Sequence, residues 1–383
     1  MAKQIQSYDF LIIGGGMAGI SVAATLATHG SVAVLETESH IGYHSTGRSA
    51  ATYIRNYGNS TLRVLNNLAF PYLDGEAIGE SVLQPRGELL LVTPQDESGF
   101  TEFMETAQSV EALTPHQASE IVPCIRKEKI IAAVYEPDAR DIDVDRLLHG
   151  YAKQLKKNNG QIHTNTQVLT LDQDGRDWLA TTNNGNYRCR SLINAAGAWA
   201  DQLGMLAGLP AIGIQPLRRS VQVFDTANTS NNIAFNTESR MSDMNNWPLF
   251  GNFAETWYAK PQSGRLMISP ADEDPVDAQD AWPDDEVLAA GVDRFEKMVD
   301  LELGRPTHSW AGLRSFTADR SPVVGEDPLA NGFFWLAGQG GYGIQTAPAT
   351  ASTLASLCLG NSIDDHQHLV ASISPARFDR SLM

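Results

Sequence analysis

Three glycines near the N-terminus have the spacing that binds a dinucleotide. Gly14, Gly16 and Gly19 form a G-x-G-x-x-G pattern, and Glu36 follows about 20 residues further on. Gly14 permits a tight turn, Gly16 lets the backbone approach a pyrophosphate, and Gly19 lets a following helix pack close to the strand. Phosphates would bind the free N–H groups and the positive dipole end of that helix. Glu36 can accept a hydrogen bond from an adenosine ribose, and its charge would repel a 2′-phosphate.

The residues around these glycines predict a strand, a helix and a second strand. Residues 8–13 are a continuous apolar run, as in a strand buried on both faces. Apolar residues then recur at helical spacing from Met17 until His29 and Gly30 end the helix. Residues 31–35 form the second apolar strand. This βαβ unit would hold FAD or NAD equally well.

Two further segments favour a bulky planar ligand. Residues 41–51 are rich in small side chains and hydroxyls, so their backbone could pass close to a flavin. The alternative is a plain polar loop. Residues 194–201 turn from a strand into a helix, again with small residues at the bend, and offer a second place for close approach.

Composition restricts the class of protein. The 383 residues suit two domains or one domain with large insertions. A formal net charge of −17 repels polyphosphate, so we expect no nucleic-acid partner. Cys124, Cys189 and Cys358 form no CxxC pair and no metal-ligand spacing, which predicts reduced thiols, no metal site and a cytoplasmic protein. Residues 10–28 carry no charge, but glycines interrupt them, so we expect neither a transmembrane segment nor a cleaved leader.

The rest of the chain alternates between two kinds of pattern. An amphipathic helix is predicted over residues 143–158, followed by strands over 161–171, 178–182 and 187–193. Period-two alternation predicts an antiparallel sheet with one open face, in a second domain. Its strands are expected at residues 86–94, 219–226, 256–260 and 266–269. The acid-rich run 272–286 lacks the glycine and spacing of an EF-hand, and we expect a solvated loop there.

The C-terminal third carries a family resemblance. Residues 310–319 read WAGLRSFTAD, residues 321–325 read SPVVG, and an apolar strand at 333–337 leads into GQGGYGIQT. With the N-terminal unit, these motifs resemble the D-amino-acid oxidase family of FAD enzymes, which includes glycine and sarcosine oxidases. The likeness is greater to the bacterial D-arginine dehydrogenase type in YHSTGRSAA, NAAGAW, WAGLRSF and QGGYGIQT. It extends from Tyr8 to about Ser356.

The resemblance implies an α/β fold with a Rossmann-like FAD-binding domain of the glutathione-reductase type. A discontinuous antiparallel-sheet substrate domain would cap the flavin. Residues 1–84, 138–214 and 306–383 would form the FAD-binding domain, and residues 85–137 and 215–305 the substrate-binding domain.

The resemblance also implies the FAD contacts. They are Gly14, Gly16, Met17, Ala18, Gly19, Glu36, Thr37, His44, Ser45, Thr46, Arg48, Ser49, Ala50, Ala51, Val168, Ala196, Gly197, Trp199, Arg314, Gly340, Gly341, Tyr342, Gly343, Ile344, Gln345 and Thr346. Covalent flavin in sarcosine oxidases uses a cysteine near the GLR segment. Here that segment continues as Ser315-Phe316, so FAD should be noncovalent.

The implied catalytic site begins with a carboxylate clamp. Arg314, at the GLR position, is the first candidate and Arg219 the second, because a planar guanidinium binds a carboxylate through two parallel bonds. The alternative for Arg219 is a surface cation, since Arg218 stands beside it. Tyr57 and Tyr258 would add hydroxyl donors and close the pocket.

Hydride transfer from the substrate Cα to flavin N5 is the implied chemistry. The helix that begins near Gly343 would direct its positive end at the charge that develops on the flavin. Gly341 and Gln345 would touch the substrate amine and the flavin edge. No dedicated general base stands out, and His44 fits a structural role better than a catalytic one.

Glu88 decides the expected substrate. It aligns with an acid that resembles the guanidinium-binding residue of the D-arginine dehydrogenase type, although a solvent-facing strand residue is the alternative. Thr52, Ile54 and Gly251 depart from that type's pocket, and Gly251 would enlarge the pocket.

We therefore expect oxidative deamination of D-amino acids, with D-arginine and D-lysine preferred, to an imino acid that hydrolyses to a 2-oxo acid and ammonia. The alternatives are a sarcosine, glycine or opine oxidase of the same family, a broad D-amino acid dehydrogenase, an NAD-dependent dehydrogenase and a non-catalytic flavoprotein subunit. The residues leave open whether O2 or a quinone reoxidises the flavin. A quinone acceptor would suit a peripheral location at the inner membrane.

Overall fold

The computed structural model describes residues 5–225 and 244–380. The predicted βαβ unit is present: β1 (Ile5–Ile13) and β2 (Val32–Leu35) pair in parallel, and α1 (Met17–Leu26) connects them. A Cβ atom on Gly19 would lie 1.9 Å from the carbonyl oxygen of Gly14. Only glycine therefore lets α1 begin so close to the end of β1.

An eight-stranded mixed sheet is built around this unit. Its strand order is β10-β11-β12-β1-β2-β9, with β20 paired to β12 and β19 paired to β20. The added strands are β9 (Gln161–His163), β10 (Val168–Asp174), β11 (Asp177–Thr182), β12 (Gly185–Asn194), β19 (Val323–Glu326) and β20 (Phe333–Ala337).

One strand predicted from sequence is in fact two. Residues 161–171 were expected to be continuous, but β9 lies beside β2 and β10 lies at the opposite edge of the sheet. Asn165 adopts a left-handed φ of 52° between them, and the amides of Asn165 and Thr166 donate to the carbonyls of Glu38 and Glu36. The local sequence pattern does not contain these long-range bonds.

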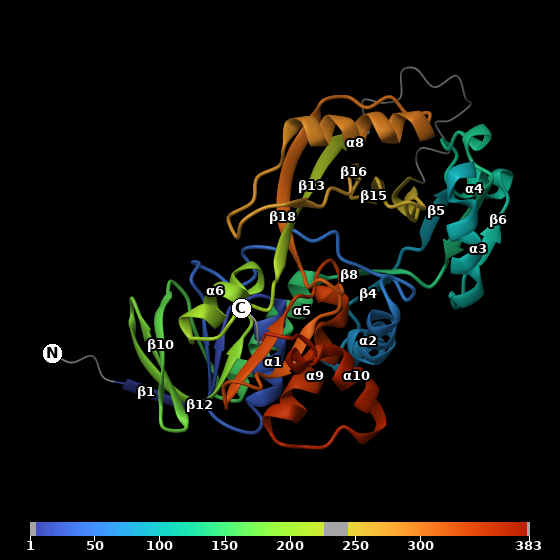
Figure 1. The fold of residues 1–383 in the computed structure, drawn as a ribbon. Helices are drawn as coiled ribbons and strands as arrows, with labels where there is room; N and C mark the ends of the chain where they lie inside the picture. The colour runs from blue at the N-terminus through green and yellow to red at the C-terminus, as the bar shows by residue number, and fades with distance from the viewer. Residues whose placement is uncertain (1–4, 226–243, 381–383) are drawn as a thin grey trace.

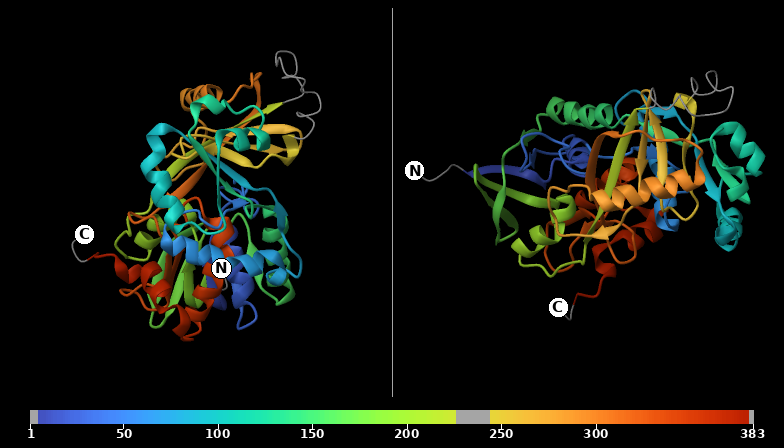
Figure 2. Two further views of the ribbon diagram at one scale, coloured as in Figure 1. Left: turned by 90° about the vertical axis from the view of Figure 1, so that its right-hand side faces the viewer. Right: turned by 90° about the horizontal axis from the view of Figure 1, so that it is seen from above.

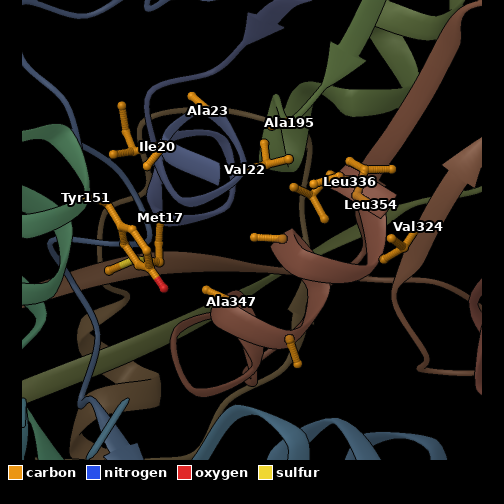
Figure 3. Close-up of a cluster of buried hydrophobic side chains, with 14 of the residues drawn as sticks. Met17, Ile20, Val22, Ala23, Tyr151, Ala195, Val324, Leu336, Ala347 and Leu354 are labelled. Atoms are coloured by element: carbon orange, nitrogen blue, oxygen red, sulfur yellow. The ribbon is translucent and has the colours of Figure 1, made fainter. Parts of the chain in front are cut away.

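Helices cover both faces of the first sheet. Alternate residues of β1 enter two separate cores, with Phe10 and Ile12 in one and Leu11 and Ile13 in the other, as expected for a strand buried on both faces. Figure 3 shows the core between α1, α5 and α9, where Tyr151 lies against Met17. The helices of this part are α2 (Ser60–Pro71), α5 (Val144–Lys157), α6 (Ala200–Leu206), α9 (Gly343–Cys358) and α10 (Gln367–Ile373).

A nine-stranded sheet forms the upper part of Figure 1. Its strands are antiparallel except for the parallel pair β5 and β14. They are β5 (Glu88–Val92), β6 (Glu111–Leu113), β7 (Ala132–Glu136), β13 (Gln215–Asp225), β14 (Leu249–Asn252), β15 (Tyr258–Gln262), β16 (Arg265–Ser269), β17 (Asp274–Pro275) and β18 (Pro306–Phe316). The strand predicted at 219–226 reaches residue 226, which lies outside the described residues.

The two faces of this second sheet differ. Helix α8 (Asp285–Met298) covers one face, where its Phe295 packs with Leu89 and Leu91 of β5. The other face turns toward the first part of the molecule (Figure 1). Helices α3 (Glu97–Thr106) and α4 (Pro115–Ile121) lie at the far end of the sheet, where Ala118 of α4 joins the core that α8 covers. A small sheet of β3 (Thr52–Tyr53), β4 (Leu83–Pro85) and β8 (Arg140–Ile142) joins the two parts.

The long antiparallel pair of β13 and β18 runs from the lower part of the molecule to the upper part (Figures 1 and 2). The expected domain division placed residues 306–316 with the FAD-binding domain. All strand pairing of β18 goes to β13 of the nine-stranded sheet, while its last residues reach the first part of the molecule.

Candidate active site

A cavity of about 450 Å³ lies at the N-termini of α1 and α9. Most residues expected to hold the cofactor line it. They are Gly14, Gly16, Met17, Ala18, Glu36, Thr37, His44, Ser45, Thr46, Arg48, Ser49, Ala50, Val168, Ala196, Gly197, Trp199, Arg314, Gly340, Gly341, Gly343 and Ile344. The cavity therefore joins the βαβ turn, the small-residue loop and the bend after β12.

The α1 end of this cavity fits a pyrophosphate. Gly16 caps α1 without a side-chain hydrogen bond, and the first turn contains no acid. The Met17 amide donates to Thr46 Oγ1 at 3.0 Å. Glu36 accepts bonds from the amides of Gly15, at 2.7 Å, and Glu38, at 2.8 Å, so its carboxylate is fixed on the wall where a ribose would bind.

Five of the expected cofactor contacts lie elsewhere. Gly19 packs on Gly14, and the Thr346 hydroxyl donates to the carbonyl of Tyr342 inside α9, so neither lines the cavity. Ala51, Tyr342 and Gln345 line the neighbouring cavity instead. Successive residues at the start of a helix face different surroundings: one cavity, the other cavity or the core. A linear motif does not show which residue faces which.

His44 has the contacts of a structural residue. Its Nε2 lies 3.0 Å from Glu38 Oε1, and its ring lies 4.9 Å from that of Tyr43 and 4.7 Å from that of Trp199. These contacts fix the loop that borders the cofactor cavity.

The acid-rich run 272–286 is largely exposed, as expected, but some of its acids pair with residues near the two cavities. Asp272 is buried and accepts bonds from the Ser220 amide and hydroxyl. Asp280 pairs with Arg48, whose Nη1 also donates to the Ala311 carbonyl at 3.0 Å. These pairs involve residues beside the cavities, and the sequence of the run alone does not specify them.

A second cavity, of about 470 Å³, adjoins the first. All residues that we expected in the catalytic site line it: Tyr57, Glu88, Arg219, Tyr258, Arg314, Gly341 and Gln345. The two cavities share Ser49, Ala50, Arg219, Tyr258, Arg314, Gly341 and Ile344. A cofactor in one and a substrate in the other would meet at these residues.

The two arginines form a clamp on one face of the β13–β18 ladder. Arg219 pairs with Gly312 and Arg314 pairs with Leu217, so the arginines are diagonal neighbours whose side chains leave the same face. Arg219 is not the surface cation considered above, because it is only 8% exposed. Its Nε donates to the Asp272 carbonyl at 2.8 Å.

Each arginine keeps donors for a ligand. Arg219 Nη2 lies 3.2 Å from Glu273 Oε1, and Arg314 Nη1 donates to the Tyr57 hydroxyl at 3.3 Å. Burial and the nearby charge of Arg314 lower the pKa of Arg219, while burial raises the pKa of Tyr57. A bound carboxylate would relieve the repulsion between the two guanidinium groups.

Gln345 lines the second cavity and is bonded to its wall. Its Oε1 accepts from the Ile54 amide at 3.0 Å, and its Nε2 donates to the Ile54 carbonyl at 3.2 Å. The side chain thus fixes the cavity wall at Ile54 and has little capacity left to bind a substrate amine.

Glu88 faces the second cavity without a partner among the described residues. Burial raises the pKa of its carboxyl well above the usual range, and the charges of Glu136 and Glu255 raise it further. A buried carboxyl without a cation prefers the neutral form. A cationic ligand group would reverse that preference.

Sequence patterns missed two residues at this site. Glu255, on the turn between β14 and β15, lines the second cavity at a left-handed φ of 52°, and no described residue binds its carboxyl. Burial raises the pKa of Glu255, against the effect of Arg314 and Arg219. Lys260 is buried and donates to the Ala50 carbonyl at 2.7 Å, which positions a segment shared by both cavities. Neither residue lies in a motif.

Thr52, Ile54 and Gly251 all line the second cavity. The Thr52 hydroxyl is buried without a hydrogen-bond partner among the described residues. A Cβ on Gly251 would lie 2.6 Å from the Trp257 carbonyl oxygen. This glycine therefore allows the close approach of β14 and β15 at the wall of the second cavity.

A dinucleotide cavity that opens onto a cavity lined by arginines, tyrosines and glutamates is the arrangement of a redox enzyme that joins a cofactor to a small substrate. The chain belongs to the DAO family, described as FAD dependent oxidoreductase, whose model matches residues 9–357. FAD is its cofactor. The uncapped N-termini and the fixed Glu36 fit that group.

The similar proteins share the whole fold. Glycine oxidase from Geobacillus kaustophilus is 24% identical over 91% of this chain and 92% of its own length. The structure of L-proline dehydrogenase from P. horikoshii superimposes with a TM-score of 0.81 at 23% identity, covering 99% of both chains. L-alpha-glycerophosphate oxidase from Mycoplasma pneumoniae, with FAD bound, gives a TM-score of 0.81 at 17% identity, covering 93% of this chain and 95% of that one.

No helix among the described residues is long and apolar enough to span a bilayer.

Proposed function

We propose that this FAD-dependent oxidoreductase deaminates D-amino acids oxidatively and prefers cationic side chains such as those of D-arginine and D-lysine. The observation that carries the proposal is the charge pattern of the second cavity. An arginine pair lies where this cavity meets the cofactor cavity, and the unpartnered Glu88 and Glu255 line the same space. A zwitterion with a cationic side chain complements both groups.

The residues divide the work of binding. Arg314 and Arg219 hold the α-carboxylate, with the Tyr57 and Tyr258 hydroxyls as further donors. Glu88 receives the guanidinium or ammonium group of the side chain. FAD, when bound, would supply the acceptor for the hydride that leaves the substrate Cα, and the imino acid product would hydrolyse to a 2-oxo acid and ammonia. The substrate amine loses its proton to solvent before or during this step, because no described residue acts as a dedicated base.

Pocket size and charge favour this substrate over small amines. A cavity of about 470 Å³ falls within the range of drug-sized ligand sites, and glycine or sarcosine would leave most of it filled with water. A small amine would also leave Glu88 without a cation. The likeness to glycine oxidase nevertheless makes oxidation of glycine, sarcosine or an opine the second candidate function. A broad D-amino acid dehydrogenase is a further outcome of the test.

The deciding experiment mixes the holoenzyme anaerobically with single amines and follows the bleaching of the flavin bands. The panel contains the D- and L-enantiomers of arginine, lysine and methionine, together with glycine and sarcosine. We expect D-arginine and D-lysine to reduce the flavin fastest and L-enantiomers to leave it oxidised. Faster reduction by glycine, sarcosine or an L-amino acid would overturn the proposal.

The electron acceptor is tested on the reduced enzyme. We propose a dehydrogenase that passes electrons to a quinone. Rapid reoxidation by O2, with stoichiometric peroxide, would identify an oxidase instead.

A further inference from the structure

Glu88 and Glu136 stand directly opposite each other on adjacent antiparallel strands. The pairing register of β5 and β7 joins Glu88 to Glu136, so both side chains leave the same face of the sheet. Like charges at such a position repel each other. The sheet therefore contains two carboxyl groups that cannot both ionise at low cost.

The surroundings of the two carboxyl groups are unequal. Glu136 is 2% exposed, and its oxygens accept bonds from the Arg55 amide at 2.7 Å and from Asn56 Nδ2 at 2.6 Å. These donors stabilise the ionised form of Glu136. Glu88 faces the second cavity and has no such donor among the described residues.

Other charged groups around Glu88 act in the same direction. Glu255 reaches the cavity from the turn between β14 and β15 and adds a second negative charge near Glu88. Burial raises the pKa of Glu136 too, but the bonds that Glu136 accepts from Asn56 and the Arg55 amide, and the charge of Arg55 in the loop after β3, act against that rise. When the Glu88–Glu136 pair holds one proton, Glu88 therefore carries it and Glu136 is ionised.

We propose that Glu136 is a positioning residue that keeps Glu88 protonated in the empty enzyme, so that a cationic substrate side chain binds in exchange for that proton. The inference rests on the proposed function, because it assigns Glu88 to the substrate side chain. The exchange is balanced: the neutral carboxyl releases H⁺ to solvent and becomes the carboxylate that pairs with the guanidinium. A neutral side chain binds without releasing this proton.

The consequence is a substrate preference that depends on pH. Below the pKa of Glu88, the ratio of kcat/KM for D-arginine to that for D-methionine rises by about tenfold per pH unit, since ionisation of one carboxyl is required. Above that pKa the ratio is constant. The α-amine of both substrates titrates alike, so its contribution cancels in the ratio.

The kinetic test compares four holoenzymes over a pH series: wild type, Glu136→Gln, Glu88→Gln and the control Glu111→Gln. Glu111 is an exposed residue of β6, the strand on the other side of β7. We expect Glu136→Gln to move the rise of the ratio to lower pH by about one unit or more, because the opposing charge is gone. Glu88→Gln should abolish the rise, and Glu111→Gln should leave it in place.

An infrared measurement tests the pair without any substrate. The ligand-free holoenzyme should show the carbonyl band of a protonated carboxylic acid, which disappears as the pH is raised. Glu88→Gln should remove the component of this band that titrates at the highest pH, even if Glu136→Gln fails to fold.

The outcomes separate the two proposals. If the band titrates but the enzyme does not oxidise D-arginine, the proposal about the Glu88–Glu136 pair stands and the proposed function is refuted. The enzyme could instead prefer D-arginine while the ratio of kcat/KM for D-arginine to that for D-methionine is independent of pH, or is not shifted by Glu136→Gln. The proposed function would then stand, and the proposal about the Glu88–Glu136 pair would be refuted.

Discussion

Gly341 lies against the guanidinium group of Arg314: a Cβ atom on this glycine would be 2.8 Å from the Arg314 Cζ. The side chain of Arg314 thus occupies the space that any larger residue at position 341 would need. The glycine-rich start of α9 serves the carboxylate clamp as well as the cofactor.

We predict that Gly341→Ala weakens substrate binding while FAD stays bound. The added methyl group would push the guanidinium aside and remove charge-assisted bonds worth about 1.5–3 kcal/mol, so kcat/KM should fall by about 10- to 150-fold. The flavin-to-protein ratio checks the cofactor. Gly304→Ala is the matched control, because no atom lies within 4 Å of its added Cβ. An unchanged kcat/KM would mean that Arg314 has room to move.

Arg314→Ala should abolish most activity. The substrate carboxylate would then face Arg219 alone in a dry site, at a cost of about 2–5 kcal/mol in kcat/KM. Arg314→Lys should recover only part of the loss, since an ammonium group cannot form two parallel bonds. The exposed Arg305, in the segment before β18, provides the control Arg305→Ala. Near-normal kcat/KM in Arg314→Ala would remove this residue from the clamp.

Glu88→Leu should change which substrate the enzyme prefers. We expect kcat/KM for D-arginine and D-lysine to fall by roughly 10- to 1,000-fold, which corresponds to about 1.4–4 kcal/mol of charge-assisted bonding. D-Methionine should change far less or improve, because it leaves the carboxyl unpaired. The measured quantity is the ratio of the arginine and methionine specificity constants. If the ratio stays constant, Glu88 lies outside the substrate contacts.

Glu88→Gln should stabilise the ligand-free protein as the pH rises. The folded-state pKa of Glu88 lies well above the unfolded value, so the folded state holds an extra proton between the two pKa values. Wild-type stability therefore falls as the pH rises from about 4.3 through the folded-state pKa. Glutamine removes this loss. Thermal unfolding at several pH values should give curves that coincide at acidic pH and separate above it, and parallel curves would contradict the assignment.

Acid treatment should release free FAD. The described cavities contain none of Cys124, Cys189 and Cys358, so neither cavity offers a thiol for a covalent flavin bond. The test is to precipitate the protein with acid and compare the flavin absorbance of supernatant and pellet. Flavin that remains in the pellet as a peptide adduct would refute noncovalent binding.

The sequence predicted those parts of the site whose backbone conformation depends on neighbouring residues in the chain. The turn at Gly14 and the α1 N-terminus follow from short-range patterns, and the position of Arg314 follows from the family resemblance of the GLR segment. Glu255 and Lys260 could not be found in this way, because their roles come from turns and strands that meet only in the folded chain. The split between β9 and β10 was missed for the same reason: the amides of residues 165 and 166 bond to residues 38 and 36.

The run 272–286 shows what composition cannot predict. Many acids in one segment usually indicate a solvated surface. Here Glu273 bridges Arg219 of β13 and Arg320 of the loop after β18, at 3.2 and 2.8 Å. Such pairing depends on which cations the fold brings near, and no property of the segment itself encodes that.

The β13–β18 ladder has a consequence for protein engineering. Because Arg219 and Arg314 lie on two paired strands, the register of β13 against β18 sets the spacing between them. A chimaera that imports a foreign cap with new side-chain selectivity should therefore exchange the segments on either side of these two strands and retain the ladder of the host. A crossover within β13 or β18 would combine strand segments from two proteins whose pairing registers can differ. The two arginines would then be shifted relative to each other by whole residues, even if the new cap folds.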